Sequence, residues 1–213
     1  MQKFSSGAQS SDTNYWSDYY KKDLAPKPPS DFAQFALKYM SPSKKLIDLG
    51  CGNGRDSMFF ARGNLKVTAV DLSEEALARI DQSLPIFTVC DDFVSSKILL
   101  CIDYDYFYSR WSLHAINQIK QDELLPKIYS AMHDGGHFFI EARTINDTIF
   151  GKGKQLGKNE FFYENHYRRF INPEQLISAL TSIGFKIVFS KESNQFSVMG
   201  TDAPTLIRIV AKK

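Results

Sequence analysis

The sequence predicts an α/β protein with a doubly wound, mostly parallel sheet. From residue 45 onward, short apolar runs alternate with stretches of helical length, and a glycine-rich turn follows the first of these runs. The chain has 213 residues, 43% of them hydrophobic and 23% charged, which suffices for one compact domain with a sizeable core. We expect an N-terminal segment over 1–40 and the main domain over 41–213.

The first half of the chain predicts strands and helices in alternation. Ser30 is expected to cap a helix, because apolar residues follow it at helical spacing. Ser73 is expected to cap another, with two carboxylates in its first turn, where the helix dipole favours negative charge. In order, we expect a helix after residue 30, a strand at 46–49, a helix at 55–61, a strand at 66–71, a helix at 73–84 and a strand at 86–89.

The second half continues the alternation and then departs from it. The expected elements are a strand at 104–108, a helix at 120–132, a strand at 137–142, a helix at 173–183 and strands at 185–190 and 205–211. The segment 143–170 shows no clear period. The last two strands have no helix between them, so a hairpin connection should make one of them antiparallel to the rest.

The turn between the first strand and the helix after it reads Asp48-Leu49-Gly50-Cys51-Gly52-Asn53-Gly54. Glycines permit positive φ and let a ligand lie directly on the backbone. In doubly wound folds, such a turn forms the crevice in which nucleotides bind. Asp71 closes the second strand, where a carboxylate can accept both ribose hydroxyls of an adenosine; the alternative is a residue of a helix N-cap region.

The glycine spacing separates two classes of nucleotide site. The dinucleotide fingerprint is G-x-G-x-x-G, but Arg55 stands where its third glycine would be. With Asp48 before the first glycine, the turn resembles motif I of the class I methyltransferases that use S-adenosylmethionine. The resemblance covers about 45–213 and is strongest to the small-molecule branch, including the tellurite-resistance, thiopurine and surface-polysaccharide-associated methyltransferases. It implies a Rossmann-like, seven-stranded sheet.

The resemblance also implies S-adenosyl-L-methionine as the cofactor. Asp71 matches the family's acidic ribose-binding residue, and the segment 90–93 matches the residues around the adenine. Asp48 suits the ammonium and sulfonium of the methionine part. The predicted cofactor-binding residues are Tyr20, Asp48, Gly50, Cys51, Gly52, Gly54, Arg55, Asp71, Leu72, Asp91, Asp92, Phe93 and Ser109.

An aromatic cluster precedes the main domain and bears on the same site. Its members are Tyr15, Trp16, Tyr19 and Tyr20. Aromatic faces could cover the cofactor and stabilise its sulfonium by cation–π contact. The alternative is that these residues fasten the N-terminus to the body, and the sequence favours neither.

Acceptor contacts are expected at the carboxyl ends of the fourth and fifth strands and in inserted loops. His114 could act as a general base or pack as a helix-face residue. Glu141 is an alternative base or a group that orients the acceptor. Arg110 could bind an anion through its fork of donors or form a surface ion pair.

The segment 143–170 is longer than an ordinary connection and holds six basic and three acidic residues. We interpret it as a substrate-covering insert that recognises an anionic acceptor. The alternative is a solvated excursion whose aromatics pack on the core. The predicted substrate-binding residues are Arg110, Arg143, Tyr163, His166, Tyr167 and Arg168.

Composition and missing motifs narrow the acceptor. The net charge of +2 implies no bulk attraction to nucleic acid or membrane. After the fourth strand, Tyr-Ser-Arg-Trp replaces the (Asp/Asn/Ser)-Pro-Pro-(Tyr/Phe) motif of enzymes that methylate base amines, and no Pro-Cys nucleophile is present. Three cysteines without a CxxC pair predict free thiols and no metal site, and a start without an apolar signal predicts a cytoplasmic protein.

The predicted function is methyl transfer to oxygen or nitrogen of a small anionic metabolite, such as a phosphorylated sugar or a surface-glycan precursor. Two alternatives stay open. One is an NAD(P)-dependent oxidoreductase, against which Arg55 argues. The other is a cofactor-binding partner protein without catalytic activity.

Overall fold

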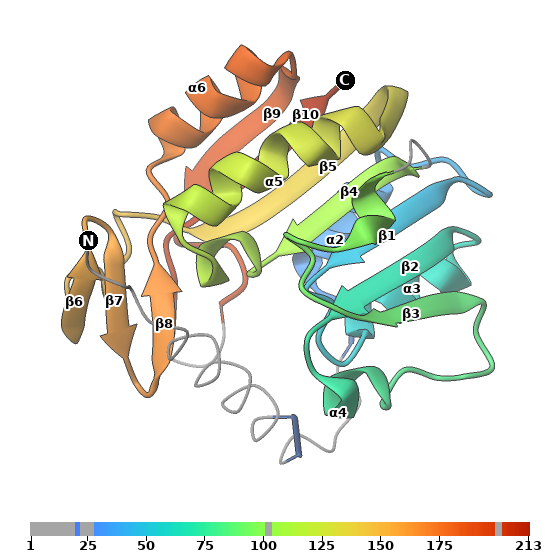
Figure 1. Ribbon diagram of the computed structural model, residues 1–213, viewed down its shortest axis with the longest axis horizontal. Coiled ribbons are helices and arrows are strands. Elements are labelled where there is room, and N and C mark those ends of the chain that lie inside the picture. The colour runs from blue at the N-terminus through green and yellow to red at the C-terminus, as the bar shows by residue number, and fades with distance from the viewer. Residues whose placement is uncertain (1–19, 22–27, 101–103, 199–201) are drawn as a thin grey trace.

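The computed structural model describes residues 20–21, 28–100, 104–198 and 202–213. Its main strands are β1 (Lys45–Leu49), β2 (Lys66–Asp71), β3 (Ile86–Cys90), β4 (Tyr104–Arg110), β5 (Met132–Arg143), β9 (Lys186–Ser193) and β10 (Leu206–Lys212). They form one seven-stranded sheet in the order β3-β2-β1-β4-β5-β10-β9 (Figure 1). Strand β10 runs antiparallel to both of its neighbours, β5 and β9, whereas the other described strand pairs of this sheet are parallel. The predicted fold class is confirmed.

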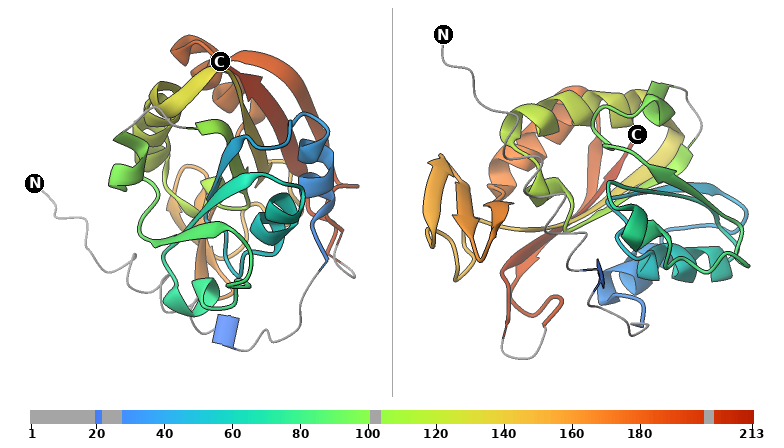
Figure 2. Two further views of the ribbon diagram at one scale, coloured as in Figure 1. Left: turned by 90° about the vertical axis from the view of Figure 1, so that its right-hand side faces the viewer. Right: turned by 60° about the horizontal axis from the view of Figure 1, so that its bottom comes forward.

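Helices cover both faces of this sheet (Figure 2). They are α2 (Asp31–Leu37), α3 (Arg55–Arg62), α4 (Glu74–Leu77), α5 (Gln118–Ala131) and α6 (Pro173–Ile183), with 3₁₀ turns η1 (Lys97–Leu100) and η2 (Leu113–Ala115). The apolar sides of α5 and α6 share one core with strand residues such as Ile47 and Ile140. Those of α2 and α3 share a second core with Leu46 and Phe139 on the opposite face. Alternate strand residues therefore face different layers.

A buried carboxylate fastens α2 to the sheet. Ser30 caps the helix by accepting a hydrogen bond from the Ala33 amide. Asp56, in the first turn of α3, accepts bonds from the Ser30 amide and hydroxyl at 2.8 and 2.7 Å and from the Tyr108 hydroxyl at 2.8 Å. Three donors satisfy this buried charge, so the N-terminal helix is joined to α3 and β4.

Two element boundaries differ from the prediction by about five residues or more. The helix capped by Ser73 ends at Leu77 rather than near residue 84, because the Asp81 carboxylate accepts bonds from the Ser83 amide and hydroxyl and forms a turn there. Strand β5 begins at Met132 rather than at residue 137 and passes through Gly135, whose φ is +82°.

The segment 143–170, which shows no clear sequence period, contains a second, three-stranded antiparallel sheet. Its strands are β6 (Lys154–Gly157), β7 (Glu160–Tyr163) and β8 (His166–Arg169). Figure 1 shows this small sheet beyond the edge at which β4 and β5 end. The insert therefore lies next to the expected acceptor side.

Polar and aromatic contacts attach the small sheet to the main domain. The buried Arg169 guanidinium donates to the carbonyl oxygens of Leu113 and Ile116 and to the side chains of Gln118 and Gln121, at 2.7–3.1 Å. The rings of Phe150, Phe161 and Phe170 pack edge to face with centroids 5.4–5.8 Å apart. These three aromatic rings of the insert therefore pack against one another. In the described parts of the chain, no helix is long and apolar enough to cross a membrane.

Candidate active site

The glycine turn has the backbone that its sequence predicts. Gly50, Gly52 and Gly54 have φ values of +74°, +56° and +71°, in the left-handed region that favours glycine. The amides of Gly50 and Cys51 both donate to the carbonyl oxygen of Val70, which joins the turn to β2. A Cβ on Gly50 would lie 2.6 Å from the Ser112 Cβ. The turn therefore has no room for side chains at this position.

Asp71 connects the end of β2 to that turn. Its carboxylate accepts a hydrogen bond from the Gly52 amide at 2.8 Å and another from the Ser73 amide at 2.9 Å. Burial raises the pKa of Asp71, and the backbone donors oppose this rise. The Asp71 carboxylate thus lies beside the glycine turn, which is compatible with the predicted ribose contact. It also accepts a bond from the N-cap residue Ser73, which is compatible with the alternative role at a helix N-terminus.

Asp48 is a buried carboxyl at the base of the turn, only 2% exposed. It accepts a hydrogen bond from the Ser57 hydroxyl at 2.6 Å. Burial raises its pKa to about 8; the Ser57 bond opposes the rise, and the charges of Asp56 and Asp71 add to it. A cationic group of a ligand would favour its charged form, so this site fits the ammonium or sulfonium of S-adenosylmethionine.

Tyr20 lies directly over the turn. A Cβ on Gly52 would overlap its hydroxyl oxygen, and the neighbouring Lys21 ammonium is 3.8 Å from the Glu75 carboxylate. The structure thus places one aromatic residue of the N-terminal cluster against the predicted cofactor site. The other three, Tyr15, Trp16 and Tyr19, lie outside the described residues.

Asp91 and Asp92, directly after β3, have different surroundings. The Asp91 carboxylate accepts a hydrogen bond from the next backbone amide and is partly exposed beside β2, whereas Asp92 forms an ion pair with Lys120 at 2.9 Å. Phe93 packs beside Gly50, and Leu72 is 47% exposed at the rim. Asp91 is therefore the better placed of the two carboxylates to meet an adenine.

The remaining predicted cofactor residues surround the turn with local contacts. Burial raises the pKa of the Cys51 thiol well above its usual value. Arg55 Nε lies 3.6 Å from the Asp56 carboxylate, and the hydroxyl groups of Ser109 and Ser112 are 2.8 Å apart. All three side chains are thus held by local contacts, and their part in binding a cofactor stays a prediction.

Trp111, directly after β4, is a site residue that the sequence prediction missed. Its φ of +61° is unusual for a bulky residue, and its amide donates to the Glu141 carbonyl at 2.8 Å. Its indole N–H donates to Glu141 Oε1 at 3.0 Å. The guanidinium carbons of Arg110 and Arg143 lie 5.0 and 5.3 Å from the ring centroid. The Tyr-Ser-Arg-Trp motif is the sequence signal that pointed here.

Glu141 is not placed to act as a base. The side chain is fully buried. Its Oε2 accepts from Arg208 Nε at 2.7 Å, and its Oε1 accepts from Trp111 and from the Ser197 hydroxyl, both at 3.0 Å. We therefore correct the predicted role: Glu141 positions Trp111 and the arginines around it.

His114, like Glu141, is not placed to act as a base. Its Nδ1 accepts a hydrogen bond from the Arg143 amide at 3.1 Å, so the neutral ring carries its proton on Nε2. Burial lowers its pKa well below the usual value, and the charges of Arg143, Arg168 and Arg169 lower it further. The ring is neutral at pH 7 but has no basic nitrogen directed at an acceptor.

The insert brings a group of polar side chains to the same place. Arg143 is only 4% exposed and pairs with Asp147 at 2.9 Å and Asp202 at 2.6 Å, so its expected role in binding substrate is corrected to a structural one. Arg168 lies over the Tyr163 ring at 5.6 Å and pairs with Glu164 at 2.8 Å.

His166 and Tyr167 complete the insert's contribution. Burial, with the charge of Arg168, lowers the pKa of His166 to about 4. Tyr167 is partly buried on β8. Both residues lie on β8, which packs against the 3₁₀ turn that holds His114.

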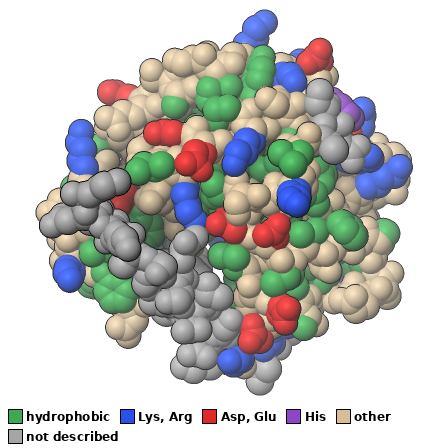
Figure 3. All heavy atoms as spheres, viewed as in Figure 1, with side chains coloured by type: hydrophobic (Ala, Val, Ile, Leu, Met, Phe, Trp, Pro, Cys, Tyr) green, Lys and Arg blue, Asp and Glu red, His purple; other side chains and the backbone are tan. Residues whose placement is uncertain are grey.

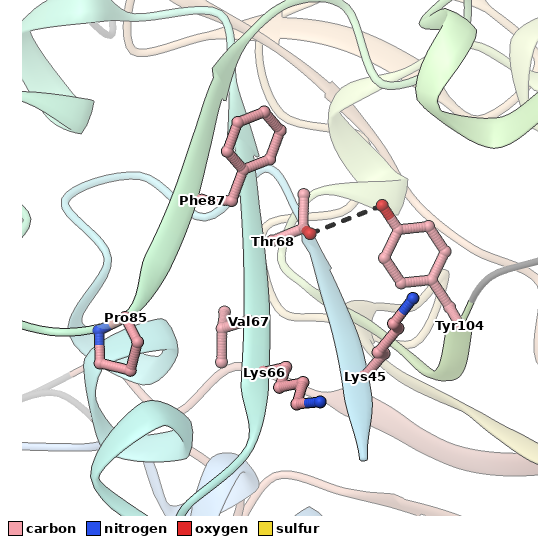
Figure 4. Close-up of a pocket in the computed structure, with 7 residues that line it drawn as sticks. All are labelled: Lys45, Lys66, Val67, Thr68, Pro85, Phe87 and Tyr104. Carbon is pink, nitrogen blue, oxygen red and sulfur yellow. Dashed lines mark hydrogen bonds between the residues drawn. The ribbon is translucent and has the colours of Figure 1, made fainter. Parts of the chain in front are cut away.

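A cavity of about 200 Å³ opens at the other end of the strands (Figure 4). Lys45, Lys66, Phe87 and Tyr104 line it, and the Tyr104 hydroxyl donates to Thr68 at 3.5 Å. Lys45 and Lys66 begin β1 and β2, whereas the glycine turn follows the last residue of β1. This cavity is therefore separate from the site described above.

Comparison with known proteins decides the family. A sequence profile described as a methyltransferase domain matches residues 19–189. The chain belongs to this methyltransferase family. The predicted resemblance to methyltransferases is confirmed.

Individual relatives of this methyltransferase are distant. Carboxy-S-adenosyl-L-methionine synthase of a Nitratiruptor species is 28% identical over 161 residues, 67% of this chain and 64% of the relative. Probable S-adenosyl-L-methionine-dependent methyltransferase TehB of Haemophilus influenzae (strain 10810) is 27% identical over 119 residues, 54% of this chain and 41% of the relative. The chain spans less than two thirds of the length of these relatives.

Solved structures share the fold of the methyltransferase. The 1,6-didemethyltoxoflavin-N1-methyltransferase of Burkholderia thailandensis, with bound 1,6-didemethyltoxoflavin and S-adenosylhomocysteine, superposes with a TM-score of 0.71 at 17% identity, over 96% of this chain and 85% of that one. TehB of Haemophilus influenzae superposes with a TM-score of 0.67 at 18% identity, over 94% and 66%.

Proposed function

We propose that this protein transfers the methyl group of S-adenosylmethionine to an oxygen or nitrogen of a small, anionic metabolite. The observation that carries the proposal is the pairing of two features at one sheet edge. The first is the glycine turn after β1, whose glycines have left-handed backbones and which lies beside Asp48 and Asp71. The second is Trp111, directly after β4, which two arginines flank. The first feature suits a methyl donor, and the second suits an anionic acceptor.

The donor half of the proposal is supported by the chemistry of the turn. Asp71 can accept ribose hydroxyls once the cofactor competes with its backbone donors, and the buried Asp48 carboxyl would be charged by a nearby ammonium. Tyr20 lies where an aromatic ring would shield the sulfonium from water. We propose on these grounds that Tyr20 forms part of a lid over the cofactor.

The acceptor half is supported by the positive charges around His114. The guanidiniums of Arg143, Arg168 and Arg169 are close enough to lower its pKa; Arg143 and Arg169 make buried structural contacts, and Arg168 lies on β8. Elsewhere, basic and acidic side chains are interspersed on the face in Figure 3, rather than gathered into a broad basic stripe. This pattern favours one small anion over a polyanion such as nucleic acid. A phosphorylated sugar or surface-glycan precursor is one member of this class.

Two experiments test the proposal. Calorimetry with S-adenosylhomocysteine and with NAD⁺ should show binding of the first only, whereas binding of NAD⁺ alone would establish the oxidoreductase alternative. Labelled S-adenosylmethionine with a panel of small anions should then give a labelled product. Tight cofactor binding without transfer to any of these anions would favour the non-catalytic alternative.

Arg168→Ala separates the acceptor from the donor side. We expect this change to raise the KM of the acceptor and to leave the affinity for S-adenosylhomocysteine nearly intact, because Arg168 lies on β8 of the insert. Lys158→Ala, an exposed change in the same insert, is the matched control. A loss of cofactor affinity in Arg168→Ala would place this arginine in the cofactor site instead.

A further inference from the structure

The Glu141 carboxylate lies beside two guanidiniums, those of Arg208 and Arg110. The Glu141 carboxylate accepts from Arg208 Nε at 2.7 Å, and Arg110 Nε lies 3.2 Å from its other oxygen. The Arg110 contact lacks hydrogen-bond geometry, because Arg110 Nε has no hydrogen-bond partner. One carboxylate thus faces two guanidiniums, and no other carboxylate of the described chain pairs with either arginine.

Arg110 is the member of this cluster that a ligand can reach. Arg208 is only 6% exposed and lies 4.0 Å from the centroid of Phe196. The Arg110 side chain is 17% exposed and lies over the Trp111 ring. Within the described residues, its two terminal nitrogens have no hydrogen-bond partner, and its charge acts on Asp48. The guanidinium therefore lies against the Trp111 ring, and its charge reaches Asp48 at the base of the glycine turn.

The polar side chains around Trp111 provide protons rather than accept them. Both oxygens of Glu141 are occupied by donors, and His114 Nδ1 is occupied by a backbone amide. The Asp147 carboxylate accepts from Arg143 and from the amides of Ile149 and Thr205. With Glu141, His114 Nδ1 and Asp147 so engaged, these three groups are poorly placed to deprotonate a neutral hydroxyl or an ammonium.

We propose that the methylated atom is an oxygen of a carboxylate, held by Arg110 over Trp111. This inference rests on the proposed methyl transfer. A carboxylate is already ionised at neutral pH and needs no base. Its single negative charge matches the single charge of the Arg110 guanidinium, whereas a phosphate monoester would bring about −1.5 to −2.

The reaction balances without a proton acceptor. A lone pair of the carboxylate oxygen forms the new bond to the methyl carbon as the bond from that carbon to sulfur breaks. The electron pair of the broken bond stays on sulfur. The sulfonium becomes the neutral thioether of S-adenosylhomocysteine, and the carboxylate becomes a neutral methyl ester. The guanidinium only orients the carboxylate.

The product distinguishes this acceptor from others. The protein is incubated with S-adenosylmethionine labelled in the methyl group and a panel of small carboxylic acids, each beside its primary amide and its alcohol. We expect label only with the acids, released as volatile methanol by mild alkali, which cleaves methyl esters and leaves ethers and methylamines intact. A label that survives alkali, or transfer to an amide or alcohol without transfer to its acid, would overturn the inference alone. No transfer to any compound, or failure to bind S-adenosylhomocysteine, would overturn the proposed function, and the inference with it.

Variants of Arg110 test its role. We expect Arg110→Gln to raise the KM for the acid about tenfold to a hundredfold, since one charge-assisted contact is lost, and to weaken the binding of S-adenosylhomocysteine much less. Arg110→Lys should recover part of the loss because it keeps the charge. Arg62→Gln, an exposed change on α3, is the control and should match the unmodified protein. If Arg110→Gln instead mainly weakens the binding of S-adenosylhomocysteine and leaves the KM of the acid unchanged, Arg110 binds the cofactor and the inference is wrong.

Discussion

The affinity for the cofactor should rise with pH because of Asp48. Its pKa is about 8 in the free protein, so only about a tenth of the molecules have the charged carboxylate at pH 7. A ligand ammonium binds the charged form and lowers its pKa in the complex. Each unit of pH between the two pKa values should therefore strengthen binding about tenfold, or about 1.4 kcal/mol.

Calorimetric titration with S-adenosylhomocysteine between pH 5.5 and 7.5 measures this effect directly. The ligand's amino group stays largely protonated in this range, so the change belongs to the protein. In buffers of different ionisation enthalpy at pH 7, we expect close to one proton, roughly 0.9, to be released per ligand bound.

Asp48→Asn is the matched variant, because the amide imitates the protonated carboxyl at the same size. It should bind more weakly at pH 7.5 and lose the dependence on pH. A dissociation constant that is flat from pH 5.5 to 7.5 in the unmodified protein, with no proton release, would refute the assignment of Asp48 to the ligand's cation.

Three further predictions concern the turn and the insert. Asp71→Ala should weaken the binding of S-adenosylhomocysteine by roughly 2–4 kcal/mol in calorimetry, because charge-assisted hydrogen bonds are lost. Asp81→Ala, on the surface, should leave the affinity unchanged. Equal affinities of the two variants would remove Asp71 from the site. Gly52→Ala should reduce cofactor affinity at least tenfold, because its φ is positive and a Cβ would displace Tyr20; full affinity would show that the turn does not contact the ligand. Arg169→Met should lower the free energy of unfolding in urea by about 3–5 kcal/mol, since four buried hydrogen bonds are lost; a change below about 1 kcal/mol would contradict its anchoring role.

Local sequence signals account for the main sheet and the donor half of the site. The glycine turn and Asp71 could be placed because strand ends and positive-φ turns depend on neighbouring residues. The small sheet of the insert was missed because its strands have only four residues each and no alternation long enough to recognise.

The acceptor half depends on contacts distant in sequence, which a single chain does not reveal. The left-handed backbone of Trp111 is held by Glu141, thirty positions later, and Glu141 is occupied in turn by Arg208 on β10. Such pairing changes a predicted base into a positioning residue. It also decides that Arg143 is a buried structural arginine while Arg110 stays accessible.

A crystal structure with S-adenosylhomocysteine tests the central claim most directly. The account predicts the ligand over the turn at 50–54, its ribose hydroxyls on Asp71, its ammonium toward Asp48 and its sulfur directed at Trp111. A ligand bound in the cavity between Lys45 and Phe87, or one that leaves Asp71 without a contact, would contradict it.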